Sequence, residues 1–125
     1  MSRYVDGFVL PVPEKKLAEY KKMSLMMGKL MKKYGALEYR ELVGDDLDPD
    51  MGGMKILTFP KMAKVKPGET VLFSYITFKS RAHRDKVNAM VMKDPSMNDP
   101  KNKDMQMPFD MKRMAYGGFK SIVDL

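Results

Sequence analysis

The segment KSRAHRDKV, residues 79–87, contains the only histidine of the chain, flanked by two arginines and an aspartate. An imidazole titrates near neutral pH, so His83 is a candidate general acid or base. In a helix that starts near Arg81, His83 shares one side with Val87 and Val91, the side expected to pack on a sheet and to border any pocket there. The alternative is a histidine in the first helical turn that only fixes a neighbouring loop. The sequence places no second catalytic group next to it.

Two further residues are candidates for binding a ligand. Arg84 would hold an anionic substrate if a pocket opened toward it, and otherwise would form a surface pair of little energetic value with Asp85. Tyr39 lies in a predicted strand, as do Asp6 and Tyr75. A buried polar group in a strand requires a partner and marks either a binding site or an interface.

Patterns for metal and cofactor binding are incomplete or absent. Residues 46–50, DLDPD, alternate carboxylates as a calcium loop does, but Met51 takes the glycine position and Leu57 the closing glutamate position. The absence of cysteine excludes thiolate metal sites and cysteine nucleophiles. The chain also lacks the GxGxxG, GxxxxGK and GxSxG motifs. We therefore expect no metal site and no cofactor.

The composition is typical of a globular protein, and we expect a single domain that spans residues 1–125. Hydrophobic residues make up 44% and charged residues 31%, close to the averages for soluble domains. No apolar run approaches the roughly 18 residues of a membrane span, and we expect a cytoplasmic protein. The net charge of +7 attracts anions, but the lysines follow one predicted helix as on a solvated face, so nucleic-acid binding is not expected. The 15 methionines are expected to fill the core.

The order of predicted elements is strand, helix, strand, strand, helix, strand. This order predicts a ferredoxin-like α+β fold, a βαββαβ antiparallel sheet with both helices on one face. Pro11-Val12-Pro13 is expected to end the first strand, and Ser80 to cap the second helix. The segment from Pro95 to Lys112 is predicted to be a lid, an arm onto a partner or a connection. The predicted strands are Arg3–Leu10, Ala36–Val43, Thr70–Phe78 and Arg113–Val123, and the predicted helices are Glu14–Tyr34 and Arg81–Lys93.

Both sides of the third predicted strand are largely apolar. Leu72 and Phe78 share one side and Phe73 and Tyr75 the other, because side chains in a strand alternate. Helices can cover only one of these sides, and the other would be a large exposed apolar patch on a monomer. We predict a homodimer in which this second side is buried. The predicted interface residues are Tyr4, Phe8, Phe73 and Tyr75.

An RNA-recognition platform is the alternative use of that second side. Such a platform stacks bases on strand aromatics, and VLFSYITF fits the aromatic positions of its motif. The basic residue and glycine that lead the motif are Val71 and Leu72 here, and Asp6 would repel phosphate. Dimerisation therefore accounts better for the aromatics.

Several blocks of the chain resemble the YbaA-like family of small proteins of unknown function. These blocks are YVDGFVLPVP, GALEYRELVGDD, VKPGETVLFSYI, SRAHRDKVNA, VMKDP and MPFDMKRMAYGGF. The resemblance implies the ferredoxin-like fold of the dimeric α+β barrel superfamily, which includes small oxygenases, isomerases and haem-degrading enzymes. The resemblance identifies no established catalytic residue. Met31 and Tyr34 stand where the family pattern has tryptophan and histidine, so no role of that histidine is transferred.

Two functions are consistent with these observations. One is an oxygenase- or isomerase-like enzyme acting on a small molecule in a pocket between helices and sheet, with His83 as acid or base. The other is a noncatalytic ligand-binding or regulatory dimer, with RNA binding as a third alternative.

Overall fold

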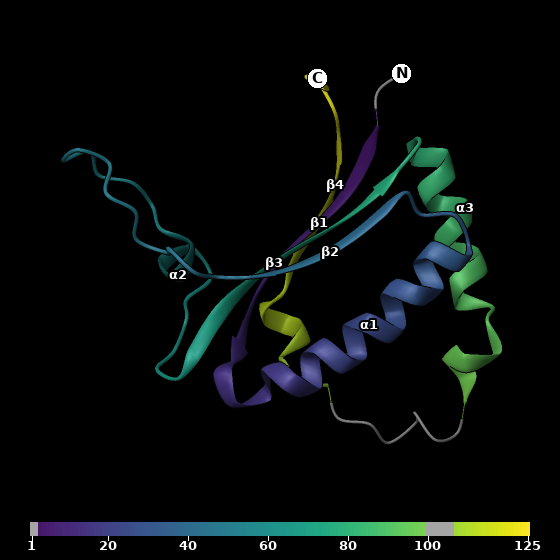
Figure 1. Cartoon of the computed structure of the whole chain (residues 1–125), viewed down its shortest axis with the longest axis horizontal. Helices are drawn as coiled ribbons and strands as arrows, with labels where there is room; N and C mark the ends of the chain where they lie inside the picture. Colours follow the sequence, from purple (N-terminus) through teal and green to yellow (C-terminus); the bar gives the residue numbers. More distant parts are fainter. Residues whose placement is uncertain (1–2, 100–106) are drawn as a thin grey trace.

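The computed structural model describes residues 3–99 and 107–125, which form one four-stranded antiparallel sheet and two long helices (Figure 1). The strand order is β2-β3-β1-β4, so the two central strands are not consecutive in the chain. The predicted order of elements is confirmed. The strands are β1 Tyr4–Pro13, β2 Glu38–Val43, β3 Glu69–Phe78 and β4 Ala115–Lys120, and the helices are α1 Leu17–Lys33, α2 Phe59–Met62 and α3 Arg81–Met92.

β1 continues through the two prolines that we expected to end it. Its pairing with β3 runs from Tyr4 to Pro13, whereas its pairing with β4 stops at Val9. Beyond Val9 one side of β1 is therefore an edge, where proline removes no ladder hydrogen bond. β4 in turn is shorter than predicted, because a 3-10 turn occupies Met111–Arg113.

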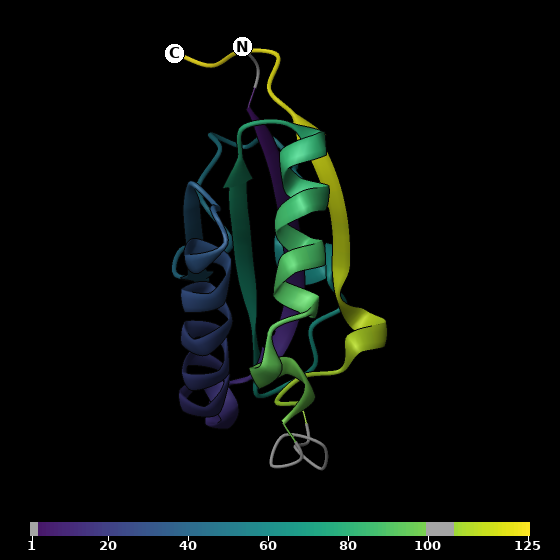
Figure 2. The ribbon, with the colours of Figure 1, turned by 90° about the vertical axis from the view of Figure 1, so that its right-hand side faces the viewer.

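Both long helices lie on the same face of the sheet (Figure 2). The core beneath them has two parts, one around Phe78, Val87 and Val91 and one around Leu10 and Leu72. α3 begins as predicted, because the Ser80 Oγ accepts a hydrogen bond from the His83 backbone N–H at 3.1 Å. Within the described residues, no helix is long and apolar enough to cross a bilayer.

The sheet register shows that one part of the predicted interface was placed on the wrong face. Phe8 of β1 lies opposite Ser74 of β3, and Val9 lies opposite Phe73. Tyr4 and Phe8 therefore point toward the helices and pack against the core. Phe73 and Tyr75 point to the opposite face, which we call the open face. The sequence did not decide which side of β1 faces the helices, because both alternating sets of its residues are apolar enough to face a core.

Methionines fill the core only in part. Met27 and Met31 of α1 pack against the core as expected. Met54 and Met92, by contrast, are 69% and 63% exposed. Core packing therefore explains some of the methionines and leaves others on the surface.

The connection between β2 and β3 projects from the body as a long arm, at the left in Figure 1. Residues 44–58 of this arm contain no strand or helix, and α2 follows at its base. In the segment from Pro95 to Lys112, a 3-10 turn covers Pro95–Asn98, and Phe109 packs edge-on against Tyr20 at 5.7 Å between ring centroids. Residues 100–106 of the same segment lie outside the described residues, so the expectation of a lid or arm there stays a prediction.

Candidate ligand-binding site

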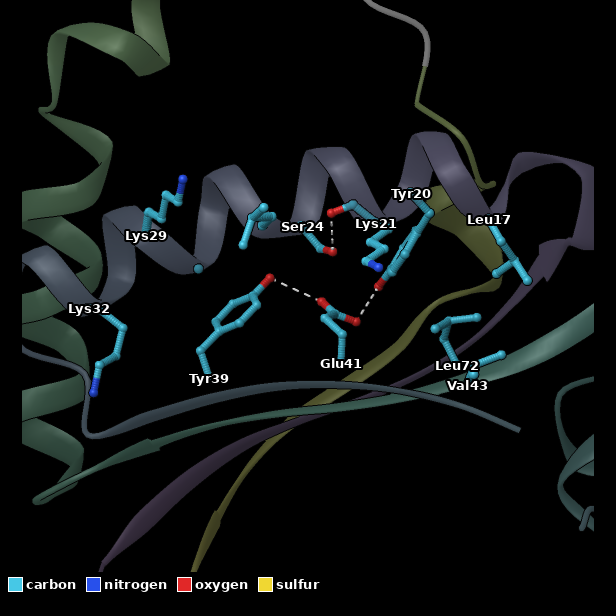
Figure 3. A pocket seen from close by; sticks show the side chains of 12 residues that line it. Leu17, Tyr20, Lys21, Ser24, Lys29, Lys32, Tyr39, Glu41, Val43 and Leu72 are labelled. Carbon is cyan, nitrogen blue, oxygen red and sulfur yellow. Dashed lines mark hydrogen bonds between the residues drawn. The ribbon is translucent and has the colours of Figure 1, made fainter. Parts of the chain in front are cut away.

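A cavity of about 750 Å³ lies between α1 and the β2 edge of the sheet (Figure 3). Its roof is one stripe of α1 in which Leu17, Tyr20, Ser24 and Gly28 recur every three or four residues. Its floor is β2, where Tyr39, Glu41 and Val43 share the side that faces α1. The volume lies in the range of small-molecule sites in proteins.

The Glu41 carboxylate is the polar centre of this cavity. It accepts hydrogen bonds from the hydroxyls of Tyr20 at 2.8 Å, Tyr39 at 3.0 Å and Ser74 at 2.7 Å. Burial and the Glu41 charge raise the pKa of the Tyr20 and Tyr39 hydroxyls well above their usual range. Both phenols therefore stay protonated and act as donors to Glu41 at physiological pH.

Gly28 lets the Tyr39 ring reach this position. A Cβ atom at residue 28 would lie 2.7 Å from the Cδ1 atom of Tyr39, closer than real Cβ contacts allow. A glycine within a helix is otherwise unfavourable by about 1 kcal/mol relative to alanine. The close approach of the ring explains why α1 contains this glycine.

The two ends of the cavity differ in polarity. Leu17, Val43 and Leu72 gather at one end, and Lys29 and Lys32 lie at the other, with Tyr39, Glu41, Tyr20 and Lys21 between them (Figure 3). The Lys32 ammonium donates one hydrogen bond to the Leu37 carbonyl at 2.8 Å. Within the described residues, neither Lys29 nor Lys32 forms an ion pair.

His83 lies away from this cavity. Its Nδ1 atom accepts a hydrogen bond from the Lys79 backbone N–H at 3.0 Å, and its ring packs edge-on against Phe78 at 5.9 Å between ring centroids. A Cβ on Gly35 would come within 3.3 Å of Nε2, so Gly35 lies next to the second ring nitrogen. His83 lines neither the α1–β2 cavity nor a smaller depression over Gly7 and Gly117. The geometry supports the structural alternative, a histidine that fixes the β3–α3 connection.

Arg84 forms the expected pair with Asp85 at 2.7 Å, but its side chain is largely buried and also has other partners. Its guanidinium bonds to the buried Asp6 carboxylate at 2.7 Å and to the Tyr116 hydroxyl at 2.9 Å. It also lies over the Tyr4 ring, 5.0 Å from the centroid. Burial raises the pKa of Asp6, and the Arg84 charge opposes that rise. Arg84 thus supplies the partner that a buried strand carboxylate requires, and it lines neither cavity.

Tyr34 joins the ends of the two long helices. Its hydroxyl donates to the buried Asp94 carboxylate at 2.6 Å, and the Lys33 ammonium reaches the same oxygen at 3.3 Å. Asp94 also accepts from the Ser96 backbone and hydroxyl. Tyr34 therefore has a structural role at the end of α1.

Of the residues singled out in the sequence, the cavity includes Tyr39 but neither His83 nor Arg84. Sequence reasoning did not identify Glu41 and Tyr20 as site residues. The available signal was period-two alternation in EYRELV, which puts Tyr39 and Glu41 on one side of a strand. Within the described residues, no group of three or more His, Cys, Asp or Glu side chains is arranged to hold a metal ion.

The open face presents Phe73 and Tyr75 beside Phe119 of β4. Phe73 is 43% and Phe119 62% exposed, and the two long helices lie on the opposite face of the sheet. Phe59 from the base of the arm packs edge-on against Phe73 at 6.4 Å between centroids. A shallow depression of about 220 Å³ lies over Gly7 and Gly117. The open face is thus an apolar surface that continues onto the arm.

Comparison with known proteins shows similarity to proteins without an assigned function. The model of a family described as "Protein of unknown function (DUF1428)" matches residues 3–111. The uncharacterized protein YbaA of Escherichia coli strain K12 is 42% identical over 122 residues, which cover 98% of each chain, and YbaA of Shigella flexneri matches equally. Among solved structures, a dimeric ferredoxin-like protein from an uncultured marine organism matches over the full length of both chains, with a TM-score of 0.55 and 11% identity. The fold is therefore the predicted ferredoxin-like α+β fold.

Proposed function

The chain belongs to the DUF1428 family of proteins of unknown function, and we propose that it is a homodimer that binds a small molecule in the cavity between α1 and β2. The observation that carries the proposal is the Glu41 carboxylate, held by three hydroxyls within a cavity whose walls are mostly apolar. An apolar cavity with a few fixed polar groups is the usual form of a small-molecule site.

The hydrogen bonds of Glu41 leave it one position for a ligand. A carboxylate has about four acceptor positions, and hydroxyl donors occupy three of them here. The remaining position can accept one further donor from a ligand. The catalytic hypothesis lacks its expected residue, because His83 lies outside the cavity. Noncatalytic ligand binding is therefore the better-supported alternative.

Filling the cavity tests the site. We expect Nile red, a neutral dye that fluoresces in apolar surroundings, to bind the wild-type protein. Ser24 is buried on the cavity side of α1, so the bulkier ring in Ser24→Trp should occupy the cavity and weaken dye binding at least tenfold. Ala18→Trp, on an exposed turn of the same helix, is the matched control and should bind normally.

Circular dichroism must first show that both tryptophan variants are folded. Leu25→Trp at the exposed rim of the cavity provides a milder block if Ser24→Trp does not fold. Equal dye binding by the wild type and all folded variants would place the dye elsewhere and overturn the assignment of the cavity.

The homodimer is supported by the open face. Phe73, Tyr75 and Phe119 form an apolar surface on the side of the sheet opposite the helices, and such a surface on a small protein marks an interaction site. A second copy is the occupant we propose, because the structural relative is described as dimeric. RNA is the poorer occupant, since Arg40 on this face is paired with Glu38 at 3.6 Å.

Sedimentation equilibrium tests the dimer. Phe73→Glu should convert the protein to monomers, because two charges would be buried at the contact. Met92→Glu introduces the same charge at an exposed position on α3 and should leave the dimer intact. A wild-type protein that sediments as a monomer at all concentrations would refute the dimer without affecting the cavity assignment.

A further inference from the structure

We infer that the ligand of the α1–β2 cavity is an amphipathic carboxylic acid, with an apolar tail at one end, an acid group at the other and a hydroxyl between them. This inference rests on the proposed function, since it names the class of molecule that the same cavity would bind. It is carried by the order of polarity along the cavity (Figure 3).

The shape of the cavity favours an extended molecule. Its roof follows α1 from Leu17 to Lys32, about 22 Å at 1.5 Å per residue. A compact ligand would fill only part of this length. A chain lying along the helix would contact both ends at once, and the two ends differ in chemistry.

The end of the cavity that would hold the ligand's tail is apolar on both walls. Leu17 on α1 faces Val43 on β2 and Leu72 on β3, and no charged side chain separates them in Figure 3. Val43 is 55% exposed, so a ligand tail would remove apolar surface from water. Burial of apolar surface contributes about 25 cal/mol per Å², which makes this end a favourable place for a hydrocarbon tail.

The opposite end is positively charged. Lys29 and Lys32 both lie on exposed turns of α1 and line this end of the cavity. In Figure 3 the Lys32 side chain extends toward β2 and that of Lys29 extends away from it. The single hydrogen bond from Lys32 to the Leu37 carbonyl leaves two of its three N–H donors for a ligand. The Lys32 ammonium therefore complements a carboxylate at this end, and the positive charge of Lys29 lies on the next turn of the helix.

Glu41 lies between these ends and is the reason that we place a hydroxyl on the ligand. Its fourth acceptor position suits a neutral donor, whereas an acid group placed there would meet the Glu41 charge at close range. Glu41 therefore orients the ligand, because it accepts the hydroxyl and directs the acid toward the lysines.

Three probes of the same chain length test each part of the inference. Hexadecanoate and 1-hexadecanol differ only in the acid group and are long enough to reach both ends, and 9-hydroxyhexadecanoate adds a hydroxyl near the middle of the chain. We expect isothermal titration calorimetry to show hexadecanoate binding about tenfold more tightly than 1-hexadecanol, and 9-hydroxyhexadecanoate more tightly still. High salt should weaken binding of the two acids and not that of the alcohol.

Matched variants assign these preferences to residues. Lys29→Gln/Lys32→Gln should reduce the affinity for hexadecanoate about tenfold and leave that for 1-hexadecanol unchanged. Lys15→Gln/Lys22→Gln removes the same charge from exposed positions outside the cavity and should change neither. Glu41→Gln should reduce the preference for 9-hydroxyhexadecanoate over hexadecanoate, provided that thermal unfolding shows a folded variant.

The outcomes separate this inference from the proposed function. Equal affinity for hexadecanoate and 1-hexadecanol, with Ser24→Trp abolishing both, would show that the ligand needs no acid group while the cavity remained a binding site. Equal affinity for hexadecanoate and 9-hydroxyhexadecanoate would show that the ligand needs no hydroxyl. Binding of none of the probes, together with unchanged Nile red binding in Ser24→Trp, would refute the site itself.

Discussion

Glu69 and Arg113 form an ion pair with two parallel hydrogen bonds, at 2.7 and 2.8 Å, that joins the start of β3 to the turn before β4. The hydrogen bonds from Arg113 lower the pKa of Glu69 from 4.5 to about 2. A carboxylate whose pKa is lower in the folded state stabilises the fold above its unfolded pKa. That contribution is complete above pH 4.5 and is lost as the pH falls toward 2.

Replacing Glu69 should therefore lower the stability of the fold most above pH 4.5, and less as the pH falls toward 2. We expect Glu69→Gln to lower the free energy of unfolding by about 2 kcal/mol at pH 7 and by much less at pH 3. Urea unfolding of both proteins at the two pH values measures the difference. Glu19→Gln on the exposed side of α1 is the control and should show no such dependence. An equal loss at both pH values would show that the pair does not cause the pKa shift.

The buried pair of Asp6 and Arg84 should respond asymmetrically to substitution. Arg84→Met leaves a carboxylate that is 2% exposed without its cation, at a cost of about 3 kcal/mol. Asp6→Asn leaves a charged guanidinium that is still bonded to the Asp85 carboxylate at 2.7 Å, so its cost should be smaller. Chemical denaturation at pH 7 measures both losses. Equal losses would contradict the view that the uncompensated carboxylate dominates.

The pH dependence of the Arg84→Met variant provides a second test of the interaction between Asp6 and Arg84. Burial already raises the pKa of Asp6, and removal of Arg84 should raise it further. A carboxyl with a raised folded pKa is more stable in its protonated form, so Arg84→Met should regain stability as the pH falls from 8 to 5. Asp6→Asn has no such carboxyl and should show no gain over this range.

At the scale of elements, the sequence predicted the topology because local signals agreed with one another. The β-branched and aromatic run before Phe78, the Ser80 cap and the stripe of α1 each match the elements observed. The phase of β1 was not predictable, since it depends on pairing with a strand about 70 residues away. For the same reason the sequence did not place Arg84 beside Asp6, or Tyr20 beside Glu41: these contacts exist only once the sheet has formed.

The packing of α1 on β2 gives a prediction that reverses the usual helix propensity. Alanine normally stabilises a helix interior by about 1 kcal/mol relative to glycine. Gly28→Ala should instead destabilise this protein, because its Cβ would enter the Tyr39 ring. In a Tyr39→Ala background the same change should become stabilising. Thermal unfolding of the four proteins of this cycle measures the sign in each background, and a stabilising effect in both would refute the contact.

At the scale of the whole molecule, the helices bury one face of the sheet and leave the other face continuous with the arm. The arm carries further exposed apolar residues, such as Met54 and Leu57, and Phe59 at its base packs against Phe73. Four aspartates also lie in the arm of a chain whose net charge is +7. In the proposed dimer, this acidic and apolar projection is suited to contact the basic second copy.

Changes on the arm should accordingly separate dimerisation from folding. Met54 and Leu57 are 69% and 71% exposed, so Met54→Ser/Leu57→Ser removes almost no buried surface from the protomer. We expect this variant to weaken the dimer at least tenfold in sedimentation equilibrium. Its unfolding at concentrations where the wild type is also monomeric should be unchanged. Met92→Ser on α3 removes a side chain of similar exposure and should affect neither property. If the arm variant instead unfolds more readily as a monomer, the arm stabilises its own protomer and has no distinct role in association.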